Sequence, residues 1–244
     1  MNAPITTFLR ENADTLDRLT RFMLDYNKKV NLTRITEPCE IIEKHYIDSI
    51  LPLILYDVPR GTSDNCQLST VNCQLPVISR GTIALDVGSG AGFPGVPMKL
   101  YRPDLDVTLL DSSKKRTDYL GALLHEINVN CRVVTARSEE LAHSPEHREK
   151  YGLVTARAVA NLAALCEYCL PFVQVSGVFL AMKGENDEVD SASGALKLLG
   201  GEISSIKKYE LPSGDKRSLI VIRKVRQTPT RYPRKRVNIT KNPL

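Results

Sequence analysis

The sequence has no long apolar run and no feature of a secretion signal. None of its segments approaches 18 consecutive apolar residues, the length that a membrane-spanning helix needs. The first residues, MNAPITTFLRENADTLDR, are polar and acidic, whereas a secretory signal peptide is basic and then apolar. These absences predict a cytoplasmic protein without a membrane span. At 244 residues, with 42% apolar residues, the chain is long enough for one ordinary globular domain with a small extension.

The six cysteines lack the pattern of a metal site. Cys166 and Cys169 have C-x-x-C spacing, but no second pair with zinc spacing accompanies them, and their segment has a helical pattern. A cytoplasmic compartment also favours free thiols over disulfides. We therefore predict structural thiols and no metal site.

Acidic residues are absent from the C-terminal end of the chain. From Lys216 onward the sequence has ten Lys or Arg residues and no Asp or Glu. The chain has 33 basic residues in all, so the 23 that precede Lys216 are outnumbered by the 28 acidic residues. A wholly basic end on a neutral-to-acidic body indicates a phosphate-rich partner that is met on one face. A disordered, solubilising tail is the alternative.

The N-terminal part of the chain, residues 1–57, is predicted to be a helical cap. Apolar residues recur at helical spacing over 5–29, and a second helix is expected to begin with Thr36 as its N-cap. His45 lies on this second helix, where we interpret it as a packed residue rather than as a catalyst. The following residues, 58–82, contain two near-copies of NCQL among Ser, Thr, Pro and Gly, and are predicted to form a surface loop.

From residue 83 to residue 225, short apolar runs alternate with helical patterns, which is typical of a parallel sheet with crossover helices. Five runs are predicted as parallel strands, at 83–87, 106–111, 132–135, 152–155 and 178–182. Two more, at 203–209 and 219–223, are joined by a connection too short for a crossover and are predicted to pair as an antiparallel hairpin. The predicted fold is α/β, a doubly wound sheet of seven strands with an N-terminal helical extension. Residues 226–244 follow as a basic tail.

The central motif is a glycine-rich turn after the first strand. The apolar run 83–87 contains Asp86 and is followed by GSGAGFPG, with four glycines in eight residues. Glycine tolerates positive φ and lets a ligand lie against bare backbone, so this pattern predicts a ligand-cradling turn between a strand and a helix. We expect Asp86 to face a polar group of that ligand. Asp111 ends the next strand, where a carboxylate can accept hydrogen bonds from ribose hydroxyls.

Two ligands fit this turn. The segment GAGFPG matches the dinucleotide pattern G-x-G-x-x-G, whereas DVGSGAG, which begins at Asp86, matches the D-x-G-x-G-x-G pattern of S-adenosylmethionine enzymes. The apolar strand ends at Val87, so Gly88 is the first glycine of the turn, and this register favours S-adenosylmethionine. The glycine pattern alone does not exclude a dinucleotide as the ligand.

Seven short motifs occur along the chain in a characteristic order. They are NLT at 31–33, KHYIDS at 44–49, DVGSGAGFPG at 86–95, LDS at 110–112, ARSEE at 136–140, TARA at 155–158 and MKG at 182–184. This order resembles the RsmG (GidB) family of methyltransferases, which modify N7 of a guanine in 16S ribosomal RNA. The resemblance covers about residues 20–225 and the tail, and departs from the family at 60–82, where the connection is longer than usual.

The resemblance implies a Rossmann-like methyltransferase domain over 83–225 that uses S-adenosylmethionine. The residues expected to bind this cofactor are Gly88, Phe93, Asp111, Ser138, Glu139 and Arg157. Guanine N7 already has a lone pair and loses no proton, so no general acid or base is predicted. Arg157 is the candidate for positioning the RNA or the cofactor.

The expected partner is 16S rRNA or the small ribosomal subunit, bound by a monomer. Residues expected to contact RNA are Lys183, Lys216, Arg217, Arg234, Lys235 and Arg236. The basic end argues against the main alternative, a methyltransferase for a small molecule. The intact glycine turn argues against a second one, an RNA-binding assembly factor without catalytic activity.

Overall fold

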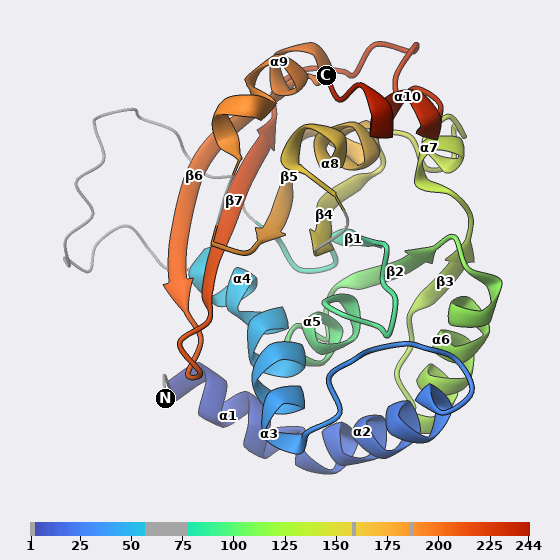
Figure 1. Cartoon of the computed structure of the whole chain (residues 1–244), viewed down its shortest axis with the longest axis vertical. Coiled ribbons are helices and arrows are strands. Elements are labelled where there is room, and N and C mark those ends of the chain that lie inside the picture. Colours follow the sequence, from blue (N-terminus) through green and yellow to red (C-terminus); the bar gives the residue numbers. More distant parts are fainter. Residues whose placement is uncertain (1–2, 57–77, 158–159, 186–187) are drawn as a thin grey trace.

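The computed structural model describes residues 3–56, 78–157, 160–185 and 188–244, and a single mixed sheet forms its centre (Figure 1). The strand order is β3-β2-β1-β4-β5-β7-β6. The strands are β1 (Ile83–Val87), β2 (Asp106–Asp111), β3 (Arg132–Thr135), β4 (Tyr151–Arg157), β5 (Val173–Lys183), β6 (Gly201–Glu210) and β7 (Lys216–Lys224). The first five are parallel, and β7 runs antiparallel to both β5 and β6. The predicted doubly wound, seven-stranded fold is confirmed.

Helices cover both faces of the sheet, which explains why its central strands are apolar on both sides. The helices are α1 (Ala3–Glu11), α2 (Ala13–Asn27), α3 (Pro38–Glu40), η1 (Ile41–Ile47), α4 (Asp48–Tyr56), α5 (Gly95–Tyr101), α6 (Lys114–Ile127), α7 (Ser138–Leu141), α8 (Leu162–Cys169), η2 (Leu170–Phe172), α9 (Val189–Leu199) and α10 (Arg236–Lys241). Side chains alternate along a strand. Accordingly, Ala84 joins the core formed with the N-terminal helices, α5 and α6, whereas Leu85 and Val87 join the core formed with α8 and α9.

Three local predictions differ from the structure. The helix expected over 5–29 is divided into α1 and α2 at Asn12, whose side-chain amide donates to the carbonyl of Phe8 (2.9 Å). Thr36 does not cap the next helix, because the helical segment begins at Pro38, where the fixed φ of proline suits a first turn. The ARSEE motif at 136–140, which follows the predicted strand 132–135 and is expected to be a turn, partly forms the short helix α7.

The basic tail is folded against the domain rather than disordered. The guanidinium of Arg148 donates to the main-chain carbonyls of Thr228, Pro229 and Tyr232. Tyr232 and Ile239 are buried in the core formed with α8 and α9. The alternative of a disordered tail is therefore wrong.

The cysteines in the described part of the chain are free thiols, as predicted. Cys166 and Cys169 are fully buried on α8, and burial raises the pKa of the Cys166 thiol to about 12. The described residues contain no His, Cys, Asp and Glu cluster suited to a metal ion. None of their helices has the length and apolar character required to cross a membrane. Most of the loop predicted at 58–82 lies outside the described residues. Cys66 and Cys73, which belong to this loop, also lie outside them.

Candidate cofactor and substrate site

The glycine turn joins β1 to α5 and is hydrogen-bonded to the C-terminal end of β2. Gly88, Gly90 and Gly92 have φ angles of 77°, 56° and 96°, a left-handed conformation that is strained for residues with a side chain. The amide of Gly88 donates to the carbonyl of Leu110 at the end of β2 (2.8 Å). The turn therefore brings bare backbone to the edge of the sheet where the two strands end.

The Asp86 carboxylate supports this turn from inside the protein. One of its oxygens accepts from the Gly95 amide (3.0 Å), and the other accepts from the Thr155 hydroxyl (3.3 Å). Burial raises the pKa of Asp86 to about 6. A Cβ atom on Gly95 would lie 2.9 Å from the Asp86 carboxylate, so only glycine permits this approach. The expectation that Asp86 faces the ligand is wrong, because its carboxylate is buried and accepts a hydrogen bond from the end of the turn instead.

A cavity of about 470 Å³ opens where β1, β2 and β4 end, and we call it the cofactor cavity. Its lining residues are Val87, Gly88, Leu110, Asp111, Ser112, Arg116, Ala136, Arg137, Ser138, Glu139, Arg157, Ala160, Tyr168, Arg236 and Thr240. The structure thus brings together five of the six residues predicted to bind the cofactor. Phe93 is the exception, because its ring is buried and stacked on that of His45, with 4.3 Å between the centroids.

The Asp111 carboxylate is held in the cavity wall by main-chain amides. It accepts from the amides of Gly90 (3.0 Å) and Ser113 (2.8 Å), and the Arg116 guanidinium lies 3.6 Å away. Each carboxylate oxygen can accept more than one hydrogen bond, so capacity remains for ribose hydroxyls.

The residues of this cavity fit S-adenosylmethionine better than a dinucleotide. A dinucleotide places its pyrophosphate on the helix N-terminus after the turn. Here the first amide of α5, that of Gly95, already donates to the Asp86 carboxylate, which would also repel a pyrophosphate. The carboxyl groups of Asp111 and Glu139 suit the hydroxyls and amino groups of S-adenosylmethionine, and the volume is in the usual range for small-molecule sites.

A second cavity, of about 390 Å³, is lined by residues of the N-terminal part and of strands β4, β5 and β7, and we call it the cap cavity. It is lined by Ile35, Lys44, His45, Asp48, Arg157, Met182, Lys183, Gly184 and Arg217. Arg157 belongs to the lining of both cavities. Its guanidinium donates to the Lys44 carbonyl (2.7 Å), pairs with Asp48 (3.3 Å) and lies 5.7 Å from the centre of the Phe93 ring.

The N-terminal helices contribute charged and aromatic groups to the cap cavity. Lys44 and His45 lie on η1, a π-helix, and such irregular turns occur often at functional sites. Asp48 is buried and accepts from the Tyr209 hydroxyl (2.9 Å). Burial, and then the nearby charge of Arg157, lower the pKa of His45 to about 3, so its imidazole is neutral. His45 is a packed residue, as predicted.

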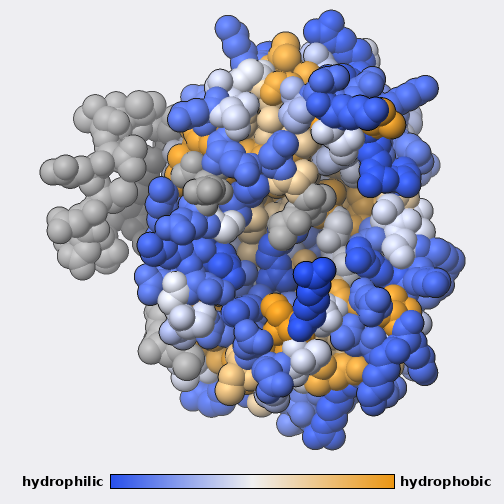
Figure 2. All heavy atoms as spheres, in the orientation of Figure 1, coloured by the Kyte–Doolittle hydropathy of each residue, from blue (hydrophilic) through white to orange (hydrophobic). Residues whose placement is uncertain are grey.

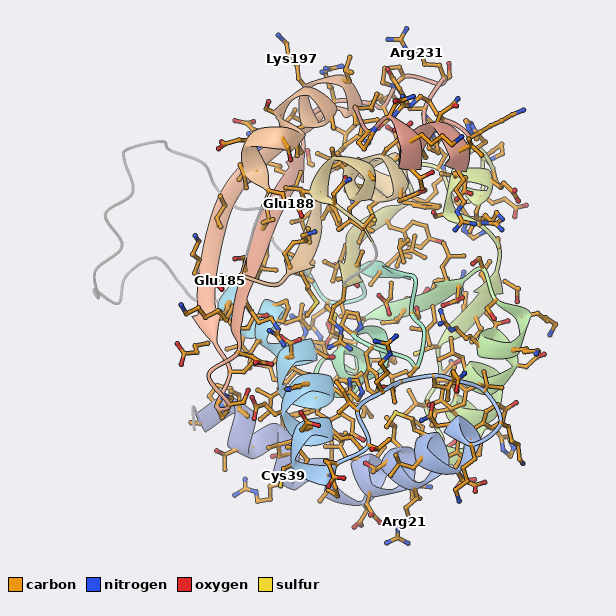
Figure 3. The ribbon with its side chains drawn as sticks, viewed as in Figure 1. Arg21, Cys39, Glu185, Glu188, Lys197 and Arg231 are labelled. Carbon is orange, nitrogen blue, oxygen red and sulfur yellow. The ribbon has the colours of Figure 1, made fainter. Side chains whose placement is uncertain are left out.

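The six residues predicted to contact RNA fall into two groups. Lys183 and Arg217 line the cap cavity, where Lys183 pairs with Glu188 (3.0 Å) and Arg217 approaches Asp48 (3.6 Å). Lys216 is next to Arg217 and pairs with the exposed Glu185; Glu185 and Glu188 both follow β5 (Figure 3).

The other group lies on the tail. Lys235 and Arg236 are exposed there, whereas the neighbouring Arg234 forms an ion pair with the fully buried Glu167 (2.7 Å). In a space-filling view, hydrophilic side chains gather over this region, where α10 lies beside α7 (Figure 2).

Several residues of the two cavities had no function assigned from the sequence. Asp48 lies in the KHYIDS motif, so the motif order was a signal, but no spacing rule connects that helix to the end of β4. Tyr168 and Thr240 line the cofactor cavity, yet nothing in the sequence around them indicates a ligand. Arg236 was predicted to contact RNA and also lines the cofactor cavity.

The fold and the cofactor cavity together define the class of S-adenosylmethionine-dependent methyltransferases. A putative methyltransferase from Bacillus halodurans has the same fold, with a TM-score of 0.50 and 13% identity over 62% of this chain and 96% of that one.

Sequence comparison then identifies the family. The model of the rRNA small subunit methyltransferase G family matches residues 69–220. The ribosomal RNA small subunit methyltransferases G of Clostridium novyi and Acetivibrio thermocellus are 43% and 46% identical, each over 90% of this chain and 84% of the relative. The chain belongs to the rRNA small subunit methyltransferase G family, and the resemblance seen in its motifs is confirmed.

Proposed function

We propose that this chain transfers a methyl group from S-adenosylmethionine to N7 of a guanine in 16S rRNA, with the cofactor in the cofactor cavity and the guanine in the cap cavity. One chain forms both cavities, so it acts as a monomer, in the cytoplasm where its rRNA substrate is made. The observation that carries the assignment is the position of Arg157 in the walls of both cavities. Methyl transfer requires that cofactor and base meet, and these cavities meet at Arg157.

The side chains of the cap cavity suit a guanine. Guanine presents O6 and N7 as adjacent acceptors on one edge and an amino group as a donor on another. Lys183 and Arg157 offer donors for the O6 edge, and the buried Asp48 offers an acceptor for the amino group. Adenine carries an amino group in place of O6. The donors of Lys183 and Arg157 would then face another donor instead of an acceptor. This complementarity favours guanine.

The chemistry requires positioning rather than proton transfer. S-adenosylmethionine supplies an electrophilic methyl group on a positively charged sulfur. Guanine N7 forms the bond to the methyl carbon with its own lone pair, and the electrons of the carbon–sulfur bond remain on sulfur, so no proton has to move. The neutral His45 is therefore not needed as a base. Alignment of this kind can contribute roughly 7–11 kcal/mol to the barrier reduction.

A comparison of cells with and without the gene tests the reaction directly. Mapping of N7-methylguanine in 16S rRNA should find one modified guanine that disappears without the gene and returns with the wild-type chain. An unchanged methylation map would contradict the proposed function.

A single-turnover pH profile tests the absence of a general base. Because N7 loses no proton and His45 titrates only near pH 3, the rate of methyl transfer should vary little between pH 6 and 8. A bell-shaped profile that moves with substitution of one side chain would contradict a mechanism based on positioning.

A further inference from the structure

We infer that the C-terminal tail is part of the cofactor site, with Arg236 and Thr240 forming the outer wall of the cofactor cavity. This inference rests on the proposed use of S-adenosylmethionine. Both residues line the cavity together with Asp111 and Glu139. They come from α10, the last helix of the chain, whereas most of the remaining lining comes from the ends of the sheet strands.

An ion pair on α8 holds the tail at this position. Both carboxylate oxygens of Glu167, which is fully buried, accept hydrogen bonds from the Arg234 guanidinium at 2.7–3.2 Å, and one also accepts from the Arg234 amide (2.7 Å). A paired arginine fork of this kind fixes orientation as well as position. Arg234 precedes α10 by two residues, and Tyr168, which lines the cofactor cavity, follows Glu167. The pair therefore holds the start of α10 beside α8, and Arg236 and Tyr168 line the same cavity.

A further contact joins the tail to the segment that follows α7, the helix that supplies Ser138 and Glu139 to the cavity. The His143 ring nitrogen Nε2 lies 2.9 Å from the carbonyl oxygen of Pro233. A neighbouring cavity is lined by residues of α7 and the tail, and three of its lining residues, Arg137, Glu139 and Arg236, also line the cofactor cavity. In Figure 1, α10 lies beside α7 and α8, far along the chain from the glycine turn.

The chemistry of the wall matches the adenosine portion of the cofactor. A guanidinium group offers a flat surface and several donors, which suit the ring nitrogens and the face of a purine. A tail that served only to bind RNA would not require the buried carboxylate of Glu167 to hold Arg234 beside the cofactor cavity. The observed anchoring therefore assigns Arg236 to the cofactor, whereas Lys235 and Arg231 are exposed basic groups of the tail that do not line the cofactor cavity.

Calorimetric titration with S-adenosylhomocysteine tests the inference without a methylation assay. The double variant Arg236→Ala/Thr240→Ala should bind this compound about tenfold more weakly than the wild type, because it loses a charged donor and part of the wall. Lys241→Ala is the matched control, since it removes the same charge from the same helix but does not line the cavity. Melting curves establish that all three proteins are folded.

Limited trypsin digestion supplies a second readout. S-adenosylhomocysteine should slow cleavage at the tail's basic residues several-fold in the wild type and much less in the double variant, whereas NAD should have no effect. Equal affinities for the wild type and the double variant, or no protection of the tail, would overturn the inference. A wild-type chain that binds neither S-adenosylhomocysteine nor S-adenosylmethionine would instead overturn the proposed function, and the inference with it.

Discussion

The N-terminal helices and the C-terminal tail are both added to the same sheet, but they complete different halves of the site. The N-terminal helices supply Lys44, His45 and Asp48 to the cap cavity, and all three lie within one short stretch of helix. The tail supplies Arg236 and Thr240 to the cofactor cavity, where the strand ends already provide most of the lining. The N-terminal helices thus form much of the cap cavity, whereas the tail adds the outer wall of the cofactor cavity.

The difference follows from what the sheet can provide. The ends of parallel strands meet at one edge, where turns and caps bind small ligands such as a cofactor. A second reactant needs a second wall opposite that edge, and only a separate element can supply it. Arg157, at the end of β4, is the residue at which the two halves join.

The largest expected effect is that of removing this junction. Arg157→Ala should lower the rate of methylation of rRNA by about a hundredfold or more, because misplacement by about 1 Å has that effect on aligned reactants. It also takes one of the cations away from the buried Asp48. Radiolabelled methyl transfer measures the loss, with Arg21→Ala, an exposed arginine on α2 (Figure 3), as the control. Full activity in Arg157→Ala would show that methyl transfer does not depend on Arg157. It would contradict the conclusion that the two halves of the site join at this residue.

The next largest effect concerns the anchor of the tail. Arg234→Ala should lower the free energy of unfolding by about 3 kcal/mol, because it leaves the carboxylate of Glu167 buried and unpaired. Lys235→Ala, which removes an exposed charge from the adjacent residue, should change it by less than about 0.5 kcal/mol. Urea unfolding followed by circular dichroism measures both values. Similar values for the two variants would show that the tail is not anchored through Arg234.

A substitution in the cap cavity separates base recognition from cofactor binding. Asp48→Asn should lower kcat/KM for rRNA by roughly ten- to a hundredfold, since a buried hydrogen-bonding group that is left unsatisfied costs about 1–3 kcal/mol. The affinity for S-adenosylhomocysteine should stay within about twofold, because Asp48 does not line the cofactor cavity. Asp25→Asn, on the exposed side of α2, is the control. A large loss of cofactor affinity in Asp48→Asn would contradict the division between the cavities.

The smallest effect concerns Asp86, the buried carboxylate that supports the glycine turn. Burial raises the pKa of Asp86 from 3.8 to about 6, so the folded state holds a proton that the unfolded state has released between these values. The stability contribution of Asp86 is therefore full below about pH 4 and lost as the pH rises through 6. Relative to Asp86→Asn, the wild type should lose roughly 1–3 kcal/mol between pH 4.5 and 7.5, measured by urea unfolding. A constant difference across this range would show that Asp86 does not titrate near pH 6.

Most of the sheet and much of the cofactor cavity followed from local patterns. The spacing of apolar runs predicted the ends of the strands within three residues, except that β5 begins at Val173 rather than at 178. The prediction succeeded because the period of two and the alternation with helices are local properties. Glycines 88, 90 and 92 predicted the turn, since their φ angles require glycine. Asp111 lies in the wall of the cofactor cavity because it is the last residue of β2, a strand whose end is recognisable in the sequence.

The errors arose where a side chain has two possible partners. Asp86 was expected to face the ligand, but the nearest unsatisfied donor is the amide of Gly95, nine residues along the chain and within the protein. For Arg234, which was grouped with its basic neighbours, the structure adds a partner that the sequence did not indicate, the buried carboxylate of Glu167 on α8. Local sequence does not distinguish a solvent-facing charge from a paired one, because the partner lies far along the chain.

The sequence by itself determined the doubly wound sheet, the glycine turn and, through the order of its motifs, the family. The tertiary structure decided that Arg157 joins two cavities and that Asp48 and Arg236 belong to different ones. Turns and strands depend on neighbours within a few residues, and these are visible in the sequence. A cavity depends on groups brought together from residues 44, 157 and 236, and only the packing of the helices and tail onto the sheet places them.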